Sequence, residues 1–356
     1  MRPLGPLATP LALLYGAGVG LFRGGYECGL LSRERFSVPV VSIGNIEAGG
    51  TGKSPLVAAL CRKVLALEKR PGVVSRGYGR VNPGTDLLVS RGEGLLVGVE
   101  EAGDEPALIV KKVPGTSVAV AADRRAGMRR LSGLCDIVFL DDGFQSLEVC
   151  PDLSLVFLPG EMLRRPMGLG DLLPAGPLRE APGVLSRATH WVLGEGQKRE
   201  VSGELLSNLA RSVGPGKMRP ILRTQFHLSG FYDFDGGART PLESLSQKTV
   251  ALVAGIANPG RVEEALLKVG ARIQGLLALP DHAPFDASTR EKIRRFSREA
   301  AKEGAEILLT TEKDRIKWTH LPETSLPVGV LEGESLLLDL PAWEEILFRL
   351  IHRRLP

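Results

Sequence analysis

The sequence predicts an α/β protein whose main sheet is mostly parallel and is covered by helices on both faces. Short apolar runs typical of buried strands alternate along the chain with segments in which apolar residues recur at helical spacing. The first such run, residues 40–43, leads into a glycine-rich loop and a helix that opens with Gly52, Lys53 and Ser54. The same alternation resumes after residue 242, which predicts a second, smaller α/β unit.

Length and composition are those of an ordinary globular protein. The 356 residues are enough for two domains, and 43% of them are apolar. The net charge of +4 permits an anionic partner, but aromatic residues make up only 5% and do not interleave with basic ones, so we expect no nucleic-acid partner. The four cysteines form no C-x-x-C pair, which indicates a reducing compartment rather than a disulfide framework or a cysteine metal site.

Residues 1–32 form a predicted membrane-associated segment. Residues 3–22 carry no charge and are flanked by Arg2 and Arg23. Three prolines disfavour a helix in the first half, and the remaining residues 11–22 would make a helix of only ~18 Å against ~30 Å of hydrocarbon. We expect the segment to dip into one leaflet; a true span and a helix packed on the protein's own core are the alternatives.

A predicted phosphate-binding loop follows the first strand, and we assign residues 33–218 to a P-loop NTPase-like domain around it. The glycines allow backbone N–H groups to turn toward phosphate oxygens, and the helix N-terminus adds positive charge. In this context Lys53 reaches the β- and γ-phosphates and Ser54 holds Mg²⁺. The loop departs from the usual pattern at Glu47, a consensus glycine position, and at Ala48, where many related loops carry a lysine. The predicted nucleotide contacts are Ile46, Glu47, Ala48, Gly49, Gly50, Thr51, Gly52, Lys53 and Ser54.

Other charged side chains follow the ends of neighbouring predicted strands. One apolar strand ends in Asp141 and Asp142, a pattern typical of the acids that hold Mg²⁺ directly or through water. Arg76 lies in a glycine-flanked turn and suits a phosphate, although a solvated turn fits the pattern equally well. Asp104 and Glu105 precede an apolar helix, and the local pattern alone favours a helix cap. Because ligands of parallel sheets bind at the carboxyl ends of the strands, we expect these side chains to lie close together.

The connections between these elements also carry signals. Residues 168–180 are rich in glycine and proline and too long for a simple connection, which predicts a functional loop. Residues 219–242, with apolar runs at 221–226 and 231–234, predict a two-stranded β-ribbon that links the domains. Residues 243–356 then form the second domain, Rossmann-like in its alternation of strands and helices and ending in an amphipathic helix over 342–354. His282 lies there on a loop between element ends, where either a structural or a functional role is possible.

A set of short motifs resembles the tetraacyldisaccharide 4'-kinase family of lipid A biosynthesis. The motifs are Gly-Asn-Ile-Glu-Ala-Gly-Gly-Thr-Gly-Lys-Ser-Pro (44–55), Ser-Arg-Gly-Tyr-Gly-Arg (75–80), Gly-Asp-Glu-Pro (103–106), Asp-Asp-Gly-Phe-Gln (141–145), Leu-Leu-Pro-Ala-Gly-Pro-Leu-Arg-Glu (172–180), Ala-Gly-Ile-Ala-Asn-Pro (254–259), Pro-Asp-His (280–282) and Thr-Glu-Lys-Asp (311–314). Each motif is weak alone, but the ordered set covers nearly the whole chain and is highly specific. One departure is Ala283, where many members carry a second histidine, so the functional weight rests on His282.

The resemblance implies ATP-dependent phosphorylation of the 4'-hydroxyl of an acylated glucosamine disaccharide 1-phosphate, with Mg²⁺, by a peripheral or monotopic protein at the cytoplasmic face of the inner membrane. It implies that Asp104 is the base for the acceptor hydroxyl, assisted by His282 from the second domain, so that the domains close before chemistry. The implied metal site comprises Ser54, Asp141, Asp142, Gln145 and Glu180. The implied substrate contacts are Arg76, Arg80, Arg124 and Arg179.

The alternative function is a membrane-associated regulatory ATPase or GTPase with a P-loop, which would hydrolyse nucleotide with water and need no sugar-lipid acceptor. Ala48 counts against it because such G-G-x-G-K-S proteins often carry a lysine there. The pairing of Asp104 with His282, which the resemblance implies, also counts against it. The oligomeric state and the acyl-chain preference have no signal in the sequence.

Overall fold

The computed structural model describes residues 5–194, 201–318 and 320–352, and its backbone confirms the predicted α/β class. The strands are β1 (Val40–Asn45), β2 (Pro71–Ser75), β3 (Leu87–Arg91), β4 (Ser117–Val120), β5 (Ile137–Asp141), β6 (Leu153–Phe157), β7 (His190–Leu193), β8 (Ile221–Asp233), β9 (Thr249–Ala254), β10 (Arg272–Ala278), β11 (Ile307–Thr311) and β12 (Val328–Leu337). The α-helices are α1 (Thr9–Glu27), α2 (Lys53–Ala66), α3 (Val99–Ala102), α4 (Asp104–Lys112), α5 (Arg124–Arg130), α6 (Gly203–Val213), α7 (Gly260–Lys268), α8 (Ala287–Lys302), α9 (Glu312–Arg315) and α10 (Leu340–Ile351).

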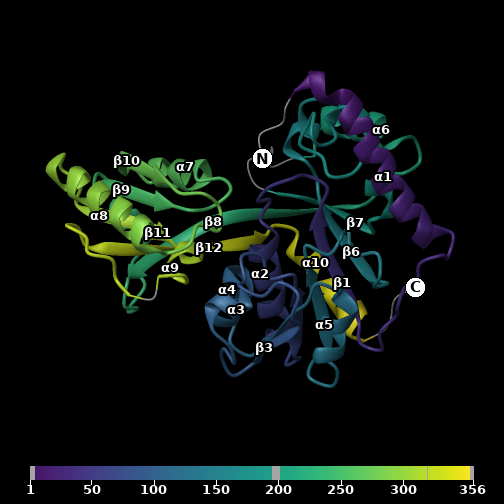
Figure 1. The fold of residues 1–356 in the computed structure, drawn as a ribbon, viewed down its shortest axis with the longest axis horizontal. Helices are drawn as coiled ribbons and strands as arrows, with labels where there is room; N and C mark the ends of the chain where they lie inside the picture. The colour runs from purple at the N-terminus through teal and green to yellow at the C-terminus, as the bar shows by residue number, and fades with distance from the viewer. Residues whose placement is uncertain (1–4, 195–200, 319, 353–356) are drawn as a thin grey trace.

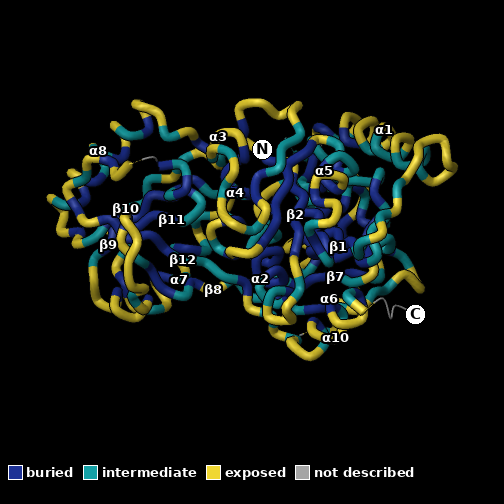
Figure 2. The backbone as a smooth tube through the Cα atoms, turned by 90° about the horizontal axis from the view of Figure 1, so that it is seen from below, coloured by how far each residue is buried: buried dark blue, intermediate teal, exposed yellow. Residues whose placement is uncertain are grey.

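The described strands join into one sheet of 12 strands, in the order β10-β9-β11-β12-β8-β7-β6-β1-β5-β2-β4-β3. Pairing is parallel except at β3–β4 and at β8–β12, so the sheet is mostly parallel, as predicted. Strand β1 lies between β5 and β6 in the first part, and all of its residues are buried. Figure 2 shows most of the strands as the buried interior of both parts, with exposed residues mainly in the helices and loops around them.

Helices cover both faces of the sheet because side chains alternate along each buried strand. In β1, Val41 and Ile43 belong to a hydrophobic cluster with residues of α2, α4 and α10, whereas Val40 packs on the opposite face with Met128 of α5. In β9, Val250 and Leu252 pack with α7, and Ala251 and Val253 pack with α8. The continuous apolar runs recognised in the sequence are therefore strands buried on two sides.

The link between the two parts differs from the predicted ribbon within residues 219–242. Strand β8 is one continuous strand, and its antiparallel partner is β12, with a register that runs from Gly329 opposite Asp233 to Leu337 opposite Thr224. Figure 1 shows these two long strands running between the two parts of the molecule. The break that we inferred near residues 227–230 is a register shift inside the ladder, and the partner strand lies too far along the chain for local patterns to reveal it.

The last helix, α10, packs on the first part of the molecule, although the predicted division assigns it to the second domain. Trp343, Leu347 and Leu350 of α10 are buried in the same cluster as Val41 and Leu56 of the first part. Strand β12 runs back along β8 toward the first part, so the amphipathic face of α10 finds its apolar partner there. Residues 3 and 354, the outer ends of two predicted segments, lie outside the described residues.

Helix α1 is longer than the sequence predicts. It begins at Thr9 because Pro10 occupies the first turn, where a missing N–H breaks no helical hydrogen bond. Ala12 is fully buried, and a Cβ added at Gly16 would lie 2.7 Å from Leu172 Cδ1, so one face of α1 packs on the protein. Of the helices within the described residues, none combines the length and the apolar character that crossing a bilayer requires.

Candidate active site

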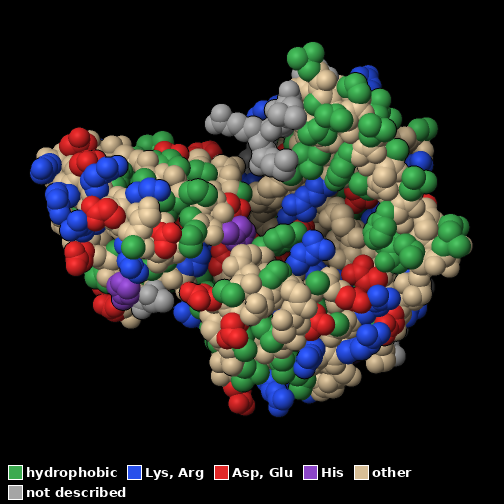
Figure 3. Space-filling view, in the orientation of Figure 1, with side chains coloured by type: hydrophobic (Ala, Val, Ile, Leu, Met, Phe, Trp, Pro, Cys, Tyr) green, Lys and Arg blue, Asp and Glu red, His purple; other side chains and the backbone are tan. Residues whose placement is uncertain are grey.

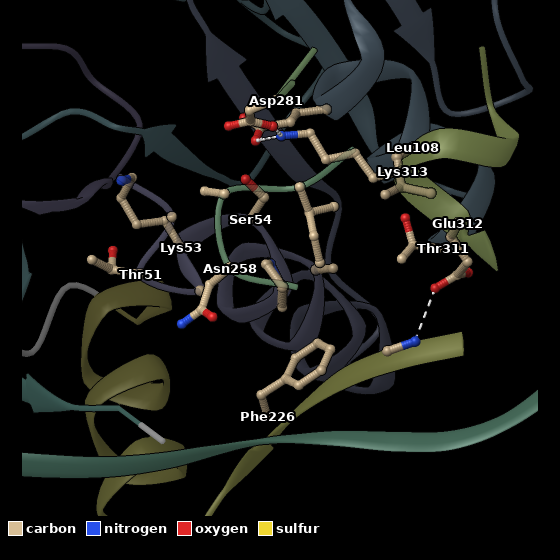
Figure 4. Close-up of a pocket in the computed structure, with 18 of the residues that line it drawn as sticks. Thr51, Lys53, Ser54, Leu108, Phe226, Asn258, Asp281, Thr311, Glu312 and Lys313 are labelled. Atoms are coloured by element: carbon tan, nitrogen blue, oxygen red, sulfur yellow. Dashed lines mark hydrogen bonds and ion pairs between the residues drawn. The ribbon is translucent and has the colours of Figure 1, made fainter. Parts of the chain in front are cut away.

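A cavity of about 390 Å³ lies where the two parts of the molecule meet. Its walls come from the carboxyl ends of β1, β2 and β5 on one side and from the loops after β9, β10 and β11 on the other. Figure 4 shows its lining side chains, among them Thr51, Lys53, Ser54, Phe226, Asn258, Asp281 and Lys313. The carboxyl-end placement predicted for the charged residues is therefore what assembles this site.

The phosphate-binding loop turns through conformations that favour glycine. Gly49 and Gly52 have φ values of +127° and +89°, which side chains rarely adopt. Lys53 Nζ donates to Asn45 Oδ1 at 3.2 Å and lies 3.3 Å from Asp142 Oδ1. Ser54 Oγ donates to Asp141 Oδ2 at 3.2 Å. Helix α2 thus begins with its cation and its hydroxyl directed at the two acids that follow β5.

The predicted contacts divide between the cavity and its support. Gly49, Gly50, Thr51, Gly52, Lys53 and Ser54 line the cavity. The remaining three residues face the 168–180 loop: Glu47 forms a bridge with Leu178, Ala48 N donates to Pro177 O at 2.9 Å, and Ile46 O accepts from Arg179 N at 2.7 Å. Backbone pairing with this loop therefore holds the start of the phosphate-binding loop in place.

The two acids after β5 titrate in opposite directions. Burial, followed by the nearby carboxylates of Glu105 and Asp142, raises the pKa of Asp141 to about 7. Burial would also raise the pKa of Asp142, but the charges of Lys53 and Arg179 outweigh it and lower that pKa. Asp141 Oδ1 is buried and has no hydrogen-bond partner among the described residues. Asp141 therefore takes up a proton near neutral pH rather than carry an uncompensated charge, unless a cation approaches it.

The residues present fit a Mg²⁺ ion that also binds phosphate. Within the described part of the chain, no group of three or more His, Cys, Asp or Glu side chains is arranged to hold a metal by protein ligands alone. Mg²⁺ in phosphoryl-transfer sites takes one or two carboxylates and completes its shell with water and phosphate oxygens. The orphaned Asp141 Oδ1 and the neighbouring Ser54 hydroxyl match that requirement.

Gln145 and Glu180, also predicted at the metal, bind each other instead. Gln145 Nε2 donates to Glu180 Oε1 and to Asn45 O, both at 2.9 Å. The other carboxylate oxygen of Glu180 lies 3.4 Å from Arg187 Nη1. Neither residue lines the cavity, so in this conformation the pair supports the strand end that carries Asn45 rather than reaching into the site.

Asp104 and His282 meet across the boundary between the two parts. His282 Nδ1 lies 3.0 Å from Asp104 Oδ1 and 2.9 Å from Asp104 Oδ2. Asp104 is buried at the start of α4, and His282 has a φ of +61° in the loop after β10. The helix-cap pattern that we read at Asp104 is thus a helix start that also presents a carboxylate to the second part of the molecule.

The two partners shift each other's titration. The hydrogen bond that His282 donates to Asp104 raises the pKa of His282, although burial and the charge of Lys313 act against it. Burial would raise the pKa of Asp104, but the hydrogen bond that it accepts from His282 and the charge of Lys313 lower it instead. Asp104 is therefore a carboxylate at neutral pH, available to accept a proton.

The four predicted substrate arginines separate into two pairs. Arg76 and Arg179 line the cavity, and Arg179 Nη1 lies 3.1 Å from Asp142 Oδ2. Arg80 is buried and donates to the carbonyls of Pro83 and Thr85, whereas Arg124 is buried and donates to those of Ala121 and Asp141. The second pair thus braces loops behind the cavity, because a buried guanidinium needs several acceptors that only backbone carbonyls supply there.

Three residues at or next to the cavity carried no prediction. Asn45 accepts from Lys53, and Lys313 Nζ lies 3.1 Å from Glu105 Oε1, 2.9 Å from Asp281 Oδ1 and 3.4 Å from His282 Nε2. Asn258 lines the cavity next to the phosphate-binding loop, where a Cβ added at Gly50 would lie 3.0 Å from Ala257 Cβ. Each lies in a motif that the sequence resemblance used, but no local pattern assigned it a role.

The comparison with known families decides which reaction class this geometry belongs to. A family model described as tetraacyldisaccharide-1-P 4'-kinase matches residues 4–351. The chain belongs to this family. The resemblance seen in the motifs is thereby confirmed over almost the entire sequence.

Relatives from this family match over most of their own length. The chain is 35% identical to the tetraacyldisaccharide 4'-kinase of Syntrophus aciditrophicus, over 98% of this chain and 94% of that protein. It is 35% identical to the one of Geobacter sulfurreducens, over 95% and 91%. Among solved structures, LpxK of Aquifex aeolicus, crystallised in complex with ATP, is 28% identical to this chain, with a TM-score of 0.73. The match covers 97% of this chain and 98% of that one.

Proposed function

We propose that this chain is the lipid A kinase of its family: it transfers the γ-phosphoryl group of ATP to the 4'-hydroxyl of a tetraacyldisaccharide 1-phosphate. Membership in the family carries the reaction class. The structural observation that supports it best is that His282, which lines the same cavity as Lys53 and Ser54, is hydrogen-bonded to the buried carboxylate of Asp104. A P-loop protein that only hydrolyses nucleotide has no need of a buried carboxylate–imidazole pair contributed from two parts of the chain.

At the nucleotide end, the phosphate-binding loop holds the triphosphate. Residues 49–54 line the cavity, where their backbone N–H groups would bind phosphate oxygens and Lys53 would supply positive charge at the β- and γ-phosphates. Ser54 and Asp141 would hold Mg²⁺, with Asp142 next to them. When bound, that ion neutralises charge on the phosphate oxygens during transfer.

At the acceptor end, Asp104 acts as general base. Its carboxylate accepts the proton of the 4'-hydroxyl as that oxygen bonds to the γ-phosphorus and the bond from phosphorus to the bridging oxygen of ADP breaks. The Nδ1–H of His282 donates to Asp104 and fixes the direction of its free lone pairs. A positioned base of this kind contributes ~10²–10⁴-fold in rate. Arg76 and Arg179 supply positive charge in the cavity for phosphate groups.

Exposed apolar side chains on α1 supply a surface for the membrane in which the lipid substrate lies. Leu14 and Leu21 are 71% and 79% exposed, and Leu11 and Phe22 are also exposed. Figure 3 shows hydrophobic side chains gathered over α1. A helix with one face on the protein and apolar side chains on the other suits attachment in the plane of the bilayer, which supports peripheral or monotopic membrane association. The lipid A kinase function is the basis for proposing the cytoplasmic face of the inner membrane as the place of attachment.

We propose a separate role for each successive segment of the chain. Residues 1–32 contact the membrane, residues 33–218 bind nucleotide and carry the base, residues 219–242 connect, and residues 243–356 supply His282. The contacts of α10 with the first hydrophobic cluster qualify this scheme, because the last helix works with the nucleotide-binding part.

Mass spectrometry of the lipid tests the proposal. The full-length protein is incubated with a tetraacyldisaccharide 1-phosphate, ATP and Mg²⁺, and we expect the lipid to gain one phosphoryl group at the 4'-position. Lys53→Ala should remove most of the transfer while the protein stays folded. ATP hydrolysis that proceeds without lipid, with no phosphorylated lipid formed, would instead support the regulatory ATPase or GTPase.

A further inference from the structure

We infer that Lys313 is a positioning residue of the proton-transfer pair: it sets which nitrogen of His282 carries the proton, and it ties His282 to the part of the molecule that holds Asp104. The inference rests on the proposed transfer reaction for its kinetic consequence, but its structural content can be measured without turnover. Lys313 lies in the four-residue helix α9, directly after β11.

The ammonium group of Lys313 is surrounded by the residues next to the pair. Its Nζ lies 2.9 Å from Oδ1 of Asp281, the residue before His282. It lies 3.1 Å from Oε1 of Glu105, the residue after Asp104. Its third contact is His282 Nε2 at 3.4 Å. Burial alone would lower the pKa of Lys313, but the carboxylates of Glu105, Asp104 and Asp281 raise it, so the group stays protonated.

These contacts select one tautomer of His282. A carboxylate only accepts hydrogen bonds, so the contact with Asp104 requires the proton on Nδ1. An ammonium only donates, so the contact with Lys313 requires a lone pair on Nε2. Both neighbours therefore favour the neutral imidazole with Nδ1–H, and Lys313 opposes the imidazolium because Nε2–H would face its own N–H groups.

This arrangement separates the roles of the two partners. Because Lys313 engages Nε2, the imidazole has no free nitrogen with which to take the proton of the acceptor hydroxyl. The proton goes to Asp104, whose second lone pairs remain available, and His282 orients that carboxylate. Without Lys313, the carboxylates of Asp104 and Asp281 would face the ring unopposed and stabilise the imidazolium, which weakens Asp104 as a base.

Lys313 also forms one of two ion pairs that join α4 to α9. Glu105 of α4 pairs with Lys313 of α9, and Lys112 of α4 pairs with Glu312 of α9, with the charges exchanged. All four side chains are at least partly buried. Figure 4 shows Glu312 and Lys313 together at this boundary. Lys112 provides a matched control, because it makes the equivalent link between the two parts without contacting His282.

The ring has few other polar neighbours. Asp281 Oδ2, from the same loop as His282, lies 3.8 Å from Nε2. The ring of Tyr78, in the turn after β2, has its centroid 6.4 Å from that of the imidazole, and Arg76 lies over the Tyr78 ring. Gly79 packs against the imidazole, since an added Cβ there would lie 3.6 Å from Nδ1. The charged groups that face His282 are therefore Asp104, Asp281 and Lys313, with Glu105 behind Lys313 and Arg76 beyond Tyr78.

Nitrogen NMR of the histidine side chains tests the tautomer directly. The chain has five histidines, and His282→Gln identifies the signal of His282. In the full-length protein above the pKa of His282, we expect the Nδ1–H tautomer. In Lys313→Met the pKa of His282 should rise, whereas in Lys112→Met it should stay as in the wild type. An Nε2–H tautomer in the wild type, or an unchanged pKa in Lys313→Met, would overturn the inference whether or not the lipid is phosphorylated.

The pH profile of lipid phosphorylation tests the kinetic consequence. In Lys313→Met we expect kcat at neutral pH to fall roughly tenfold or more, as part of the ~10²–10⁴-fold that a general base supplies. The acidic limb of kcat/KM should move to higher pH, because a raised pKa of His282 keeps the imidazolium to higher pH. Lys313→Arg retains the positive charge and should return the limb toward its wild-type position, and Lys112→Met should not move it. A limb that is the same in all variants would reduce Lys313 to a structural ion pair.

Discussion

His282 Nδ1 lies 2.9 Å from Asp104 Oδ2, although 178 positions separate the two residues in the sequence. Asp104 begins a helix of the nucleotide-binding part, and His282 follows a strand of the second part. The contact forms only when the two parts of the molecule are as close as they are here, with Gly50 against Ala257 and Glu105 against Lys313. The pair that we propose as the source of the base therefore depends on how the two parts pack against each other.

A double-mutant cycle tests whether Asp104 and His282 act as a unit. Asp104→Asn and His282→Gln should each lower kcat strongly, within ~10²–10⁴-fold, while ATP affinity measured by titration stays nearly unchanged. The double variant should be little worse than the poorer single variant, because each substitution already disables the same proton acceptor. Losses that multiply would show two independent roles, and weakened ATP binding in Asp104→Asn would move that residue to the metal site.

The raised pKa of Asp141 predicts pH-dependent Mg²⁺ binding. Because that pKa is about 7 when no cation is bound, Asp141 holds a proton below pH 7 that must leave when Mg²⁺ binds. With a non-hydrolysable ATP analogue present, the affinity for Mg²⁺ should fall by about tenfold for each pH unit below 7 and level off above it. Calorimetry in buffers of different ionisation enthalpy would count the released proton. Asp141→Asn should remove this pH dependence. Asp142→Asn should weaken Mg²⁺ binding but leave its pH dependence in place, because the pKa of Asp142 is lowered and its carboxyl is already ionised in this range.

Membrane attachment through α1 is best tested by substitution rather than truncation. Removing the N-terminus would also uncover the surface around Leu172 on which α1 packs. Leu14→Glu together with Leu21→Glu should reduce flotation with liposomes by about tenfold or more, because each replaces a largely exposed apolar side chain by a charge. Leu267→Glu, on α7 and 58% exposed, is the matched control and should float as the wild type does. Equal flotation of all proteins would place the membrane contact on another surface.

Helix α10 should stabilise the nucleotide-binding part although it follows the second part in sequence. Trp343 is buried, and its Nε1 donates to Arg223 O at 3.3 Å. Trp343→Ala should cost about 3–5 kcal/mol of unfolding free energy, the usual range for a large buried aromatic residue. Phe348→Ala, on the exposed side of the same helix, should cost far less. Chemical unfolding, monitored by the loss of ATP binding, measures both costs. A nucleotide-binding part that is as stable in Trp343→Ala as in the wild type would contradict the packing described here.

The fold class and the nucleotide-binding end of the site were predictable because their signals are local. A buried strand, the turn that glycines permit and the helix that opens with Lys53 and Ser54 are written in adjacent residues, and the apolar strand before Asp141 is equally short-range. The collinear motifs added the reaction class, which no single pattern of apolar and charged residues contains.

Long-range pairing was beyond such patterns. The partner of β8 is a strand that begins at Val328, and the apolar face of α10 is buried in the hydrophobic cluster that α2 and the first strands form. Likewise, charge pattern alone did not separate Arg76 and Arg179, which face the cavity, from Arg80 and Arg124, which bind backbone carbonyls. The direction of a long side chain depends on which acceptors the folded chain brings within its reach, and here those acceptors come from other segments.

The succession of strands and helices along the chain, the phosphate-binding loop and the acids at the strand ends therefore follow from residues that interact within a few positions of one another. The contact between Asp104 and His282, the place of Lys313 beside His282 and the return of α10 depend on surfaces that meet only after both parts have packed. Local backbone preferences specify the first group, whereas burial and charge pairing between distant segments specify the second.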